Sequence, residues 1–194
     1  MTSGGPTAVL FPGQGAQSVG MAGEWCDADP QAEALFARAS EILGYDLLGV
    51  CRNGPAERLN STAVSQPGIL VTSLAALEVL RGRDPAPLEA ATITAGLSLG
   101  EYTALVFAGA LTFDDAVRLV DVRGRAMQEC AEQRPGAMVA VLGLERDRWR
   151  HCVTNVAAAT CWRLPMCCAP ATWSRRARPR PAGGLRRRRE LRGP

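Results

Sequence analysis

The sequence contains no lysine, since all 22 of its basic residues are arginine, and this bias indicates a GC-rich coding sequence. It also lacks any run of 18 consecutive apolar residues. A helix that crosses a bilayer needs about 20 of them, so we expect no membrane-spanning helix and no membrane partner. The first ten residues have neither a basic start nor a long apolar core, which predicts a cytoplasmic protein without a secretory signal.

Histidine occurs once, as His151, and the seven cysteines contain no CxxC pair. These features argue against a zinc site. The number of cysteines is odd, their spacing is irregular and no secretion signal precedes them, so a disulfide framework is not expected either. We therefore predict free thiols, no metal and no cofactor.

The net charge of +3 hides two segments of opposite sign. Residues 1–155 hold 12 arginines against 18 acidic residues, whereas residues 156–194 hold 10 arginines against one acid. The basic tail would fit a nucleic-acid-binding arm, but the acidic body argues against one. We therefore expect no nucleic-acid partner.

Short apolar runs alternate with helical patterns over the first 158 residues. This pattern predicts strands at 7–11, 91–95 and 137–142, and helices at 30–43, from Gln66 to about 80, at 101–108, from Thr112 to 132 and at 145–158. Such alternation is typical of an α/β protein with a mainly parallel sheet. Beyond residue 160 no period of 2 or 3.6 remains, so this segment is predicted to be disordered.

The sequence Gly96-Leu-Ser-Leu-Gly100 fits G-x-S-x-G between a predicted strand and a predicted helix. A sharp turn there would expose the Ser98 hydroxyl at the end of the sheet, and the two glycines would allow close passage of the backbone. The N–H of Leu99 and the positive end of the next helix would then face a developing oxyanion. The context favours Ser98 as a nucleophile.

Four blocks around this turn are similar to the malonyl-CoA:acyl-carrier-protein transacylases and the related acyltransferase domains of polyketide synthases. They are FPGQGAQ at 11–17, SQPGIL at 65–70, GLSLGEYTALVFAGAL at 96–111 and VRLVDVRGRAMQE at 117–129. The resemblance runs from about residue 8 to residue 145. It implies an α/β-hydrolase-like large subdomain at 1–133 and the start of a ferredoxin-like small subdomain at 134–158, before an Arg/Pro-rich tail at 159–194.

The resemblance also implies an activity. Ser98 would take the malonyl group from coenzyme A as an ester, and the phosphopantetheine thiol of an acyl carrier protein would then receive it, in fatty acid or polyketide synthesis. The backbone N–H groups of Gln14 and Leu99 would form the oxyanion hole, and Arg123 would bind the malonyl carboxylate. Malonyl-CoA is then a substrate rather than a cofactor, and the protein is expected to be a monomer.

The sequence departs from the family pattern at two places. Leu97 stands where the family has the histidine of GHSLGEY. The family's general base is a histidine about 100 residues after the serine, whereas the single His151 follows Ser98 by 53 residues and is not expected to fill that role. The abrupt change to Arg, Pro, Cys and Trp predicts a frameshift near residues 155–162, and hence a truncated chain of impaired activity.

Several alternatives stay open at this stage. The chain fits a non-catalytic remnant that binds a carrier protein or coenzyme A, and the elbow alone fits a serine hydrolase, although the GQG turn and Arg123 argue against the latter. Gln14 would also serve as a plain turn residue, and Arg123 as a solvated helix residue. We interpret Glu101 and Tyr102 as structural, and Gln66 as a support of the site.

Overall fold

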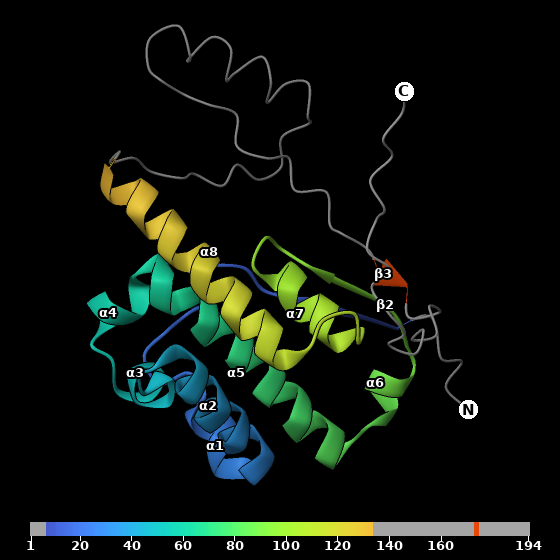
Figure 1. Cartoon of the computed structure of the whole chain (residues 1–194). Coiled ribbons are helices and arrows are strands. Elements are labelled where there is room, and N and C mark those ends of the chain that lie inside the picture. The colour runs from blue at the N-terminus through green and yellow to red at the C-terminus, as the bar shows by residue number, and fades with distance from the viewer. Residues whose placement is uncertain (1–6, 134–172, 175–194) are drawn as a thin grey trace, which may run out of the picture.

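The computed structural model describes residues 7–133 and 173–174 (Figure 1). The strands are β1 (Thr7–Phe11), β2 (Ala91–Gly96) and β3 (Trp173–Ser174). The helices are α1 (Gly23–Ala28), α2 (Pro30–Leu43), α3 (Leu47–Asn53), α4 (Ala56–Asn60), α5 (Thr62–Arg83), α6 (Ala86–Glu89), α7 (Gly100–Phe107) and α8 (Phe113–Gln133). The chain is therefore an α/β protein, as the sequence predicts.

The described strands form one sheet in the order β1-β2-β3. β1 and β2 are parallel, with Phe11 opposite Gly96, and β3 runs antiparallel to β2. The strands predicted at 7–11 and 91–95 are confirmed, and the second continues to Gly96. Parallel strands bring their carboxyl ends to one edge, so the turns after β1 and after β2 lie side by side.

Helix α5 is the central helix of the core. It packs against α2, α7 and α8, as Figure 1 shows, and its buried side chains include Leu70, Leu74 and Leu77. By length and composition alone it would suffice to span a membrane, although no uninterrupted apolar run marks it in the sequence. Most of its apolar stretch is buried inside the protein, which is the behaviour of a core helix.

The start of α5 differs from the sequence prediction. The helix begins at Thr62 rather than Gln66, and Pro67 lies inside it. The Oε1 atom of Gln128 on α8 accepts a hydrogen bond of 2.9 Å from the Thr62 N–H, which supplies a partner for a free amide of the first turn. The helix also continues past residue 80 to Arg83, and Leu80 in its last turn is 36% exposed.

Local caps define the other long helices. Asp29 caps α2 by accepting a hydrogen bond of 2.8 Å from the Gln31 N–H. Thr112 caps α8, since its hydroxyl accepts from the Asp115 N–H at 3.1 Å and donates to the Asp115 carboxylate at 2.8 Å. The predicted helices at 30–43, at 101–108 and from Thr112 to 132 are confirmed within one residue. The strand predicted at 137–142 and the helix predicted at 145–158 lie outside the described residues.

Candidate functional site

The turn between β2 and α7 places Ser98 in a strained conformation. Its φ is 53°, in the left-handed region that a residue with a side chain rarely adopts. The backbone is tightly packed on both sides, because a Cβ atom on Gly96 would lie 1.9 Å from the Gly100 carbonyl carbon. A Cβ on Gly100 would lie 2.4 Å from the Phe11 carbonyl oxygen. Only glycine fits at these two positions, so the G-x-S-x-G pattern has a steric cause here.

The turn after β1 lies against this elbow. The Leu97 N–H donates a hydrogen bond of 3.2 Å to the Phe11 carbonyl oxygen, and a Cβ on Gly13 would lie 2.6 Å from the Leu97 carbonyl oxygen. Gln14 is anchored through its side chain, whose Nε2 donates to Thr62 Oγ1 at 3.1 Å. Its backbone N–H and that of Leu99 make no hydrogen bond to the part of the chain that the structure describes.

Arg123 reaches the elbow from α8. Its Nη2 donates a hydrogen bond of 2.8 Å to Ser98 Oγ, and its Nη1 donates to Gln66 Oε1. The Tyr102 ring lies under the guanidinium, with its centroid 5.7 Å from Cζ. The structure therefore brings together three of the blocks that the sequence analysis singled out, from α5, the elbow and α8.

Two neighbouring arginines on α8 differ from Arg123. Arg118 is 54% exposed and pairs with Asp114 and Asp115, and Arg125 is 63% exposed and pairs with Asp121. Arg123 is only partly exposed, and within residues 7–133 it has no acidic partner. Its description as a solvated helix residue is therefore wrong. A positive charge held beside a hydroxyl by neutral groups is suited to bind an anionic substrate group.

Gln66 supports this arrangement from the core. It is fully buried, its Oε1 accepts from Arg123, and its Nε2 contacts Met127 Sδ at 3.3 Å. Sequence reasoning anticipated this support but missed Met127 and the contact of Tyr102 with Arg123. Helical spacing was an available signal for Met127, which lies four residues after Arg123 on α8.

Leu97 lies in the turn just before Ser98 and is 55% exposed. The family histidine absent at this position would therefore have been accessible rather than buried. His151, which is not expected to be the general base, lies outside the described residues. Within them, no group of three or more histidine, cysteine, aspartate or glutamate side chains is arranged to hold a metal ion.

A serine on a strand–turn–helix elbow with unpaired backbone N–H groups beside it is the local geometry of α/β enzymes that act on acyl groups. The comparison with protein families agrees with this class. Residues 9–162 match the family described as acyl transferase domain, and the chain belongs to that family. The match extends beyond residue 145, where the resemblance in the sequence analysis ends.

The similar proteins are malonyl-CoA-acyl carrier protein transacylases. A probable mitochondrial one from Drosophila melanogaster is 51% identical over 136 residues, which are 70% of this chain and 36% of that protein. The one from Escherichia coli K12 is 48% identical over 141 residues, which are 71% of this chain and 44% of that protein. The chain thus spans less than half the length of these relatives.

Solved structures give the same result. The malonyl CoA-acyl carrier protein transacylase of Clostridium perfringens superposes with a TM-score of 0.70 at 39% identity, over 79% of this chain and 48% of that one. A malonyl-transacylase solved in complex with its type II PKS acyl-carrier protein superposes with a TM-score of 0.68 at 37% identity, over 80% of this chain and 49% of that one.

Proposed function

We propose that the protein is an acyl-carrier-protein S-malonyltransferase that moves a malonyl group from coenzyme A to the phosphopantetheine thiol of an acyl carrier protein. The observation that carries the proposal is the hydrogen bond between Arg123 and Ser98 Oγ, beside the elbow. It puts a carboxylate-binding group next to a hydroxyl that is suited to form an ester. The names of the similar proteins support the same reaction.

In the proposed reaction, the Ser98 hydroxyl attacks the thioester carbonyl of malonyl-CoA, and coenzyme A leaves as the thiol once the tetrahedral intermediate collapses. The negative charge on the former carbonyl oxygen is stabilised by the N–H groups of Gln14 and Leu99. The carrier-protein thiol then attacks the ester and regenerates Ser98. No cofactor takes part in these two reaction steps.

Arg123 would give the enzyme its preference for malonyl over acetyl groups. A guanidinium forms two parallel hydrogen bonds with a carboxylate, which a lysine cannot copy. An acetyl thioester would leave this charge without an anionic partner, so it would bind less well. Leu99, rather than Gln, follows the serine, and this resembles the malonyl-selective rather than the methylmalonyl-selective members of the family.

Turnover is expected to be slow. Within the described residues, the side chain bonded to Ser98 Oγ is Arg123, which donates a proton and does not accept one. No base for Ser98 stands among residues 7–133, and loss of the base in other serine enzymes lowers the rate by several powers of ten. Detection of the malonyl ester on Ser98 is therefore a more sensitive test of the proposal than the steady-state rate of malonyl transfer.

The proposal extends to the finer architecture and the setting. We infer an α/β-hydrolase-like large subdomain at 1–133, the start of a ferredoxin-like small subdomain at 134–158 and a tail at 159–194. The protein would act as a cytoplasmic monomer without nucleic-acid or membrane partners. Fatty acid and polyketide synthesis both fit, and one structural neighbour is a malonyl-transacylase in complex with a type II PKS acyl-carrier protein.

The test is intact-mass spectrometry of the purified chain after incubation with malonyl-CoA. We expect one malonyl adduct, located on Ser98 by peptide mapping and absent from Ser98→Ala. Addition of a holo acyl carrier protein should remove the adduct and malonylate the carrier. Saturable binding of malonyl-CoA by both proteins without any adduct would instead identify a non-catalytic coenzyme A-binding remnant, and release of free malonate by the wild type would identify a hydrolase.

A further inference from the structure

Tyr102 is the one partner of Arg123 among the described residues that is not hydrogen-bonded to it. The residue lies in the first turn of α7, and its side chain is partly buried against the core. Its ring centroid is 5.7 Å from Arg123 Cζ, within the range in which the electron-rich face of an aromatic ring attracts a cation. The sequence analysis had assigned Tyr102 only a structural part.

Within residues 7–133, the hydrogen bonds of Arg123 use only two of its N–H donors. A guanidinium carries five N–H groups, and the described contacts use one on Nη1, toward Gln66, and one on Nη2, toward Ser98. The Tyr102 ring, over which the guanidinium carbon lies, attracts the cation and consumes no donor. The remaining N–H groups therefore stay available for the paired hydrogen bonds that a carboxylate accepts.

We propose that Tyr102 is a positioning residue that holds the guanidinium of Arg123 in the orientation needed to bind the free carboxylate of a dicarboxylic acyl thioester. This inference rests on the proposed function and deepens it, since it assigns part of the substrate selectivity to a residue that does not touch the substrate.

The need for such a restraint arises during the proposed reaction. Once Ser98 Oγ carries an acyl group, it is an ester oxygen, which is a poorer acceptor than a hydroxyl, and Arg123 loses one of its two anchors. The bond to Gln66 alone leaves the guanidinium free to rotate about a single contact. The Tyr102 ring restricts that rotation, so that less side-chain entropy is lost when the carboxylate binds.

The first experiment compares two substitutions in the full chain by calorimetric titration with malonyl-CoA and acetyl-CoA. Tyr102→Leu removes the ring, and we expect the affinity for malonyl-CoA to fall by about 5- to 30-fold, while the affinity for acetyl-CoA is unchanged. Tyr102→Phe keeps the ring and should stay within about twofold of the wild type. An equal loss for both thioesters, or a loss in Tyr102→Phe as large as in Tyr102→Leu, would overturn the proposal.

The molecule offers a matched control. Arg58 on α4 lies over the ring of Tyr45, in the connection between α2 and α3, at 5.3 Å, which is the same kind of contact without Arg123. Tyr45→Leu removes a partly buried ring of equal size, so it reproduces the general loss of packing. The malonyl-CoA affinity of Tyr45→Leu should equal that of the wild type. A fall as large as that of Tyr102→Leu would show that the effect of Tyr102→Leu comes from a general loss of packing and not from the position of Arg123.

A second measurement needs no ligand. An aromatic ring displaces the NMR signals of protons above its face, so the Arg123 Nε–H signal, assigned by its loss in Arg123→Lys, should shift in Tyr102→Leu and stay in place in Tyr102→Phe. No shift in Tyr102→Leu would overturn the positioning role whatever the substrate. By contrast, equal affinity of the wild type for malonyl-CoA and acetyl-CoA would contradict the proposed function. The NMR result would still decide whether Tyr102 positions Arg123.

Discussion

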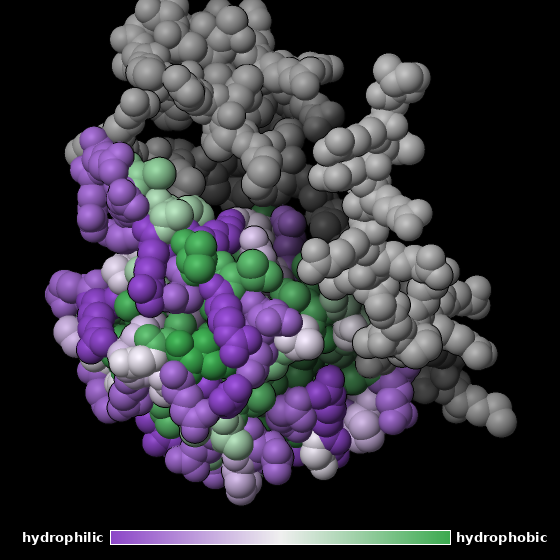
Figure 2. Space-filling view, in the orientation of Figure 1, coloured by the Kyte–Doolittle hydropathy of each residue, from purple (hydrophilic) through white to green (hydrophobic). Residues whose placement is uncertain are grey.

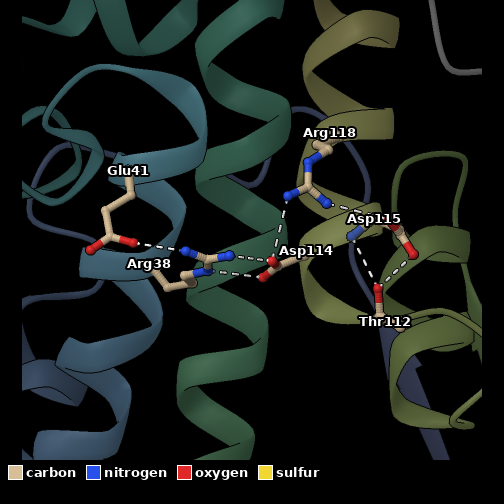
Figure 3. Close-up of polar contacts among 6 residues, drawn as sticks. All are labelled: Arg38, Glu41, Thr112, Asp114, Asp115 and Arg118. Carbon is tan, nitrogen blue, oxygen red and sulfur yellow. Dashed lines mark hydrogen bonds and ion pairs between the residues drawn. The ribbon is translucent and has the colours of Figure 1, made fainter.

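The arginine at the elbow and the arginines between α2 and α8 are held in opposite ways. Arg38 on α2 contacts the Glu41 carboxylate at 2.8 Å and the Asp114 carboxylate through Nε at 3.1 Å (Figure 3). Arg118 lies 3.5 Å from the same Asp114. These side chains are largely exposed, and each cation there already has a carboxylate. At the elbow, Arg123 is held by an amide, a hydroxyl and an aromatic ring.

The difference explains which of the two regions is suited to bind a ligand. A carboxylate that approaches Arg38 or Arg118 must compete with a bound carboxylate and with water, which screens such pairs. At Arg123 it meets a charge whose present partners are neutral. Apolar residues also reach the surface of α8, where Leu119 is 47% and Val122 67% exposed, and Figure 2 shows apolar residues gathered on the face that carries α7 and α8.

The largest expected effect comes from the tight packing of the elbow. Gly96→Ala would put a Cβ atom 1.9 Å from the Gly100 carbonyl carbon, so the backbone must shift, and we expect a loss of about 3 kcal/mol or more in the free energy of unfolding. Gly23→Ala is the control, because nothing lies within 4 Å of its Cβ position. Urea titrations followed by circular dichroism measure both. Equal stability of the two variants would show that the elbow is not sterically constrained.

The next effect separates Arg123 from its neighbours on α8. Arg123→Lys keeps the positive charge but loses the planar fork, so we expect the preference for malonyl-CoA over acetyl-CoA in equilibrium binding to fall by about 10- to 100-fold. Arg118→Lys and Arg125→Lys should leave the preference unchanged, because both arginines pair with carboxylates at the surface. A similar fall in all three variants would mean that a general positive potential, rather than Arg123, selects the substrate.

Local features of the sequence predicted the parts of the fold that depend on neighbouring residues. The strand before Pro12 and the elbow at Ser98 follow from short apolar runs and from Gly96, whose close contact with Gly100 is local in the sequence. The cap of α2 at Asp29 likewise needs only a carboxylate two residues before the amide that it binds. For this reason β1, β2 and α2 have nearly the predicted bounds.

Features that depend on distant residues could not be predicted in this way. The start of α5 depends on Gln128, which is 66 residues further along the chain, and the contact of Tyr102 with Arg123 joins two helices. The short helices α1, α3, α4 and α6 have too few residues for a periodic pattern to be recognised. The resemblance to a family supplied Arg123 and Gln14, because it carries information about positions that meet only in the fold.

A smaller effect is expected at the surface end of α8. Thr112→Ala removes the hydroxyl that accepts a hydrogen bond from the Asp115 N–H, and should lower the free energy of unfolding by about 1 kcal/mol. Thr112→Ser keeps the hydroxyl and should restore most of it. The malonyl-CoA affinity should be the same in both variants, since this cap lies in the region away from Ser98. A loss of affinity in Thr112→Ala would show that the two regions are coupled.

The smallest effect is expected from Asp114 itself. The Arg38 guanidinium hydrogen-bonds to this carboxylate and lowers its pKa below the usual value of 3.8. A carboxylate with a lowered folded-state pKa stabilises the protein above the pKa of the unfolded chain, and that contribution is lost as the pH falls through the folded-state value.

Asp114→Asn should therefore be slightly less stable than the wild type at pH 7. The difference should shrink below about pH 4, where the carboxylate becomes protonated, and in 1 M salt, where charges are screened over about 3 Å. Urea titrations at the two pH values and the two salt concentrations measure it. A difference that persists in 1 M salt and at low pH would show that Asp114 contributes through packing rather than charge, and the contrast with Arg123 would then rest on burial alone.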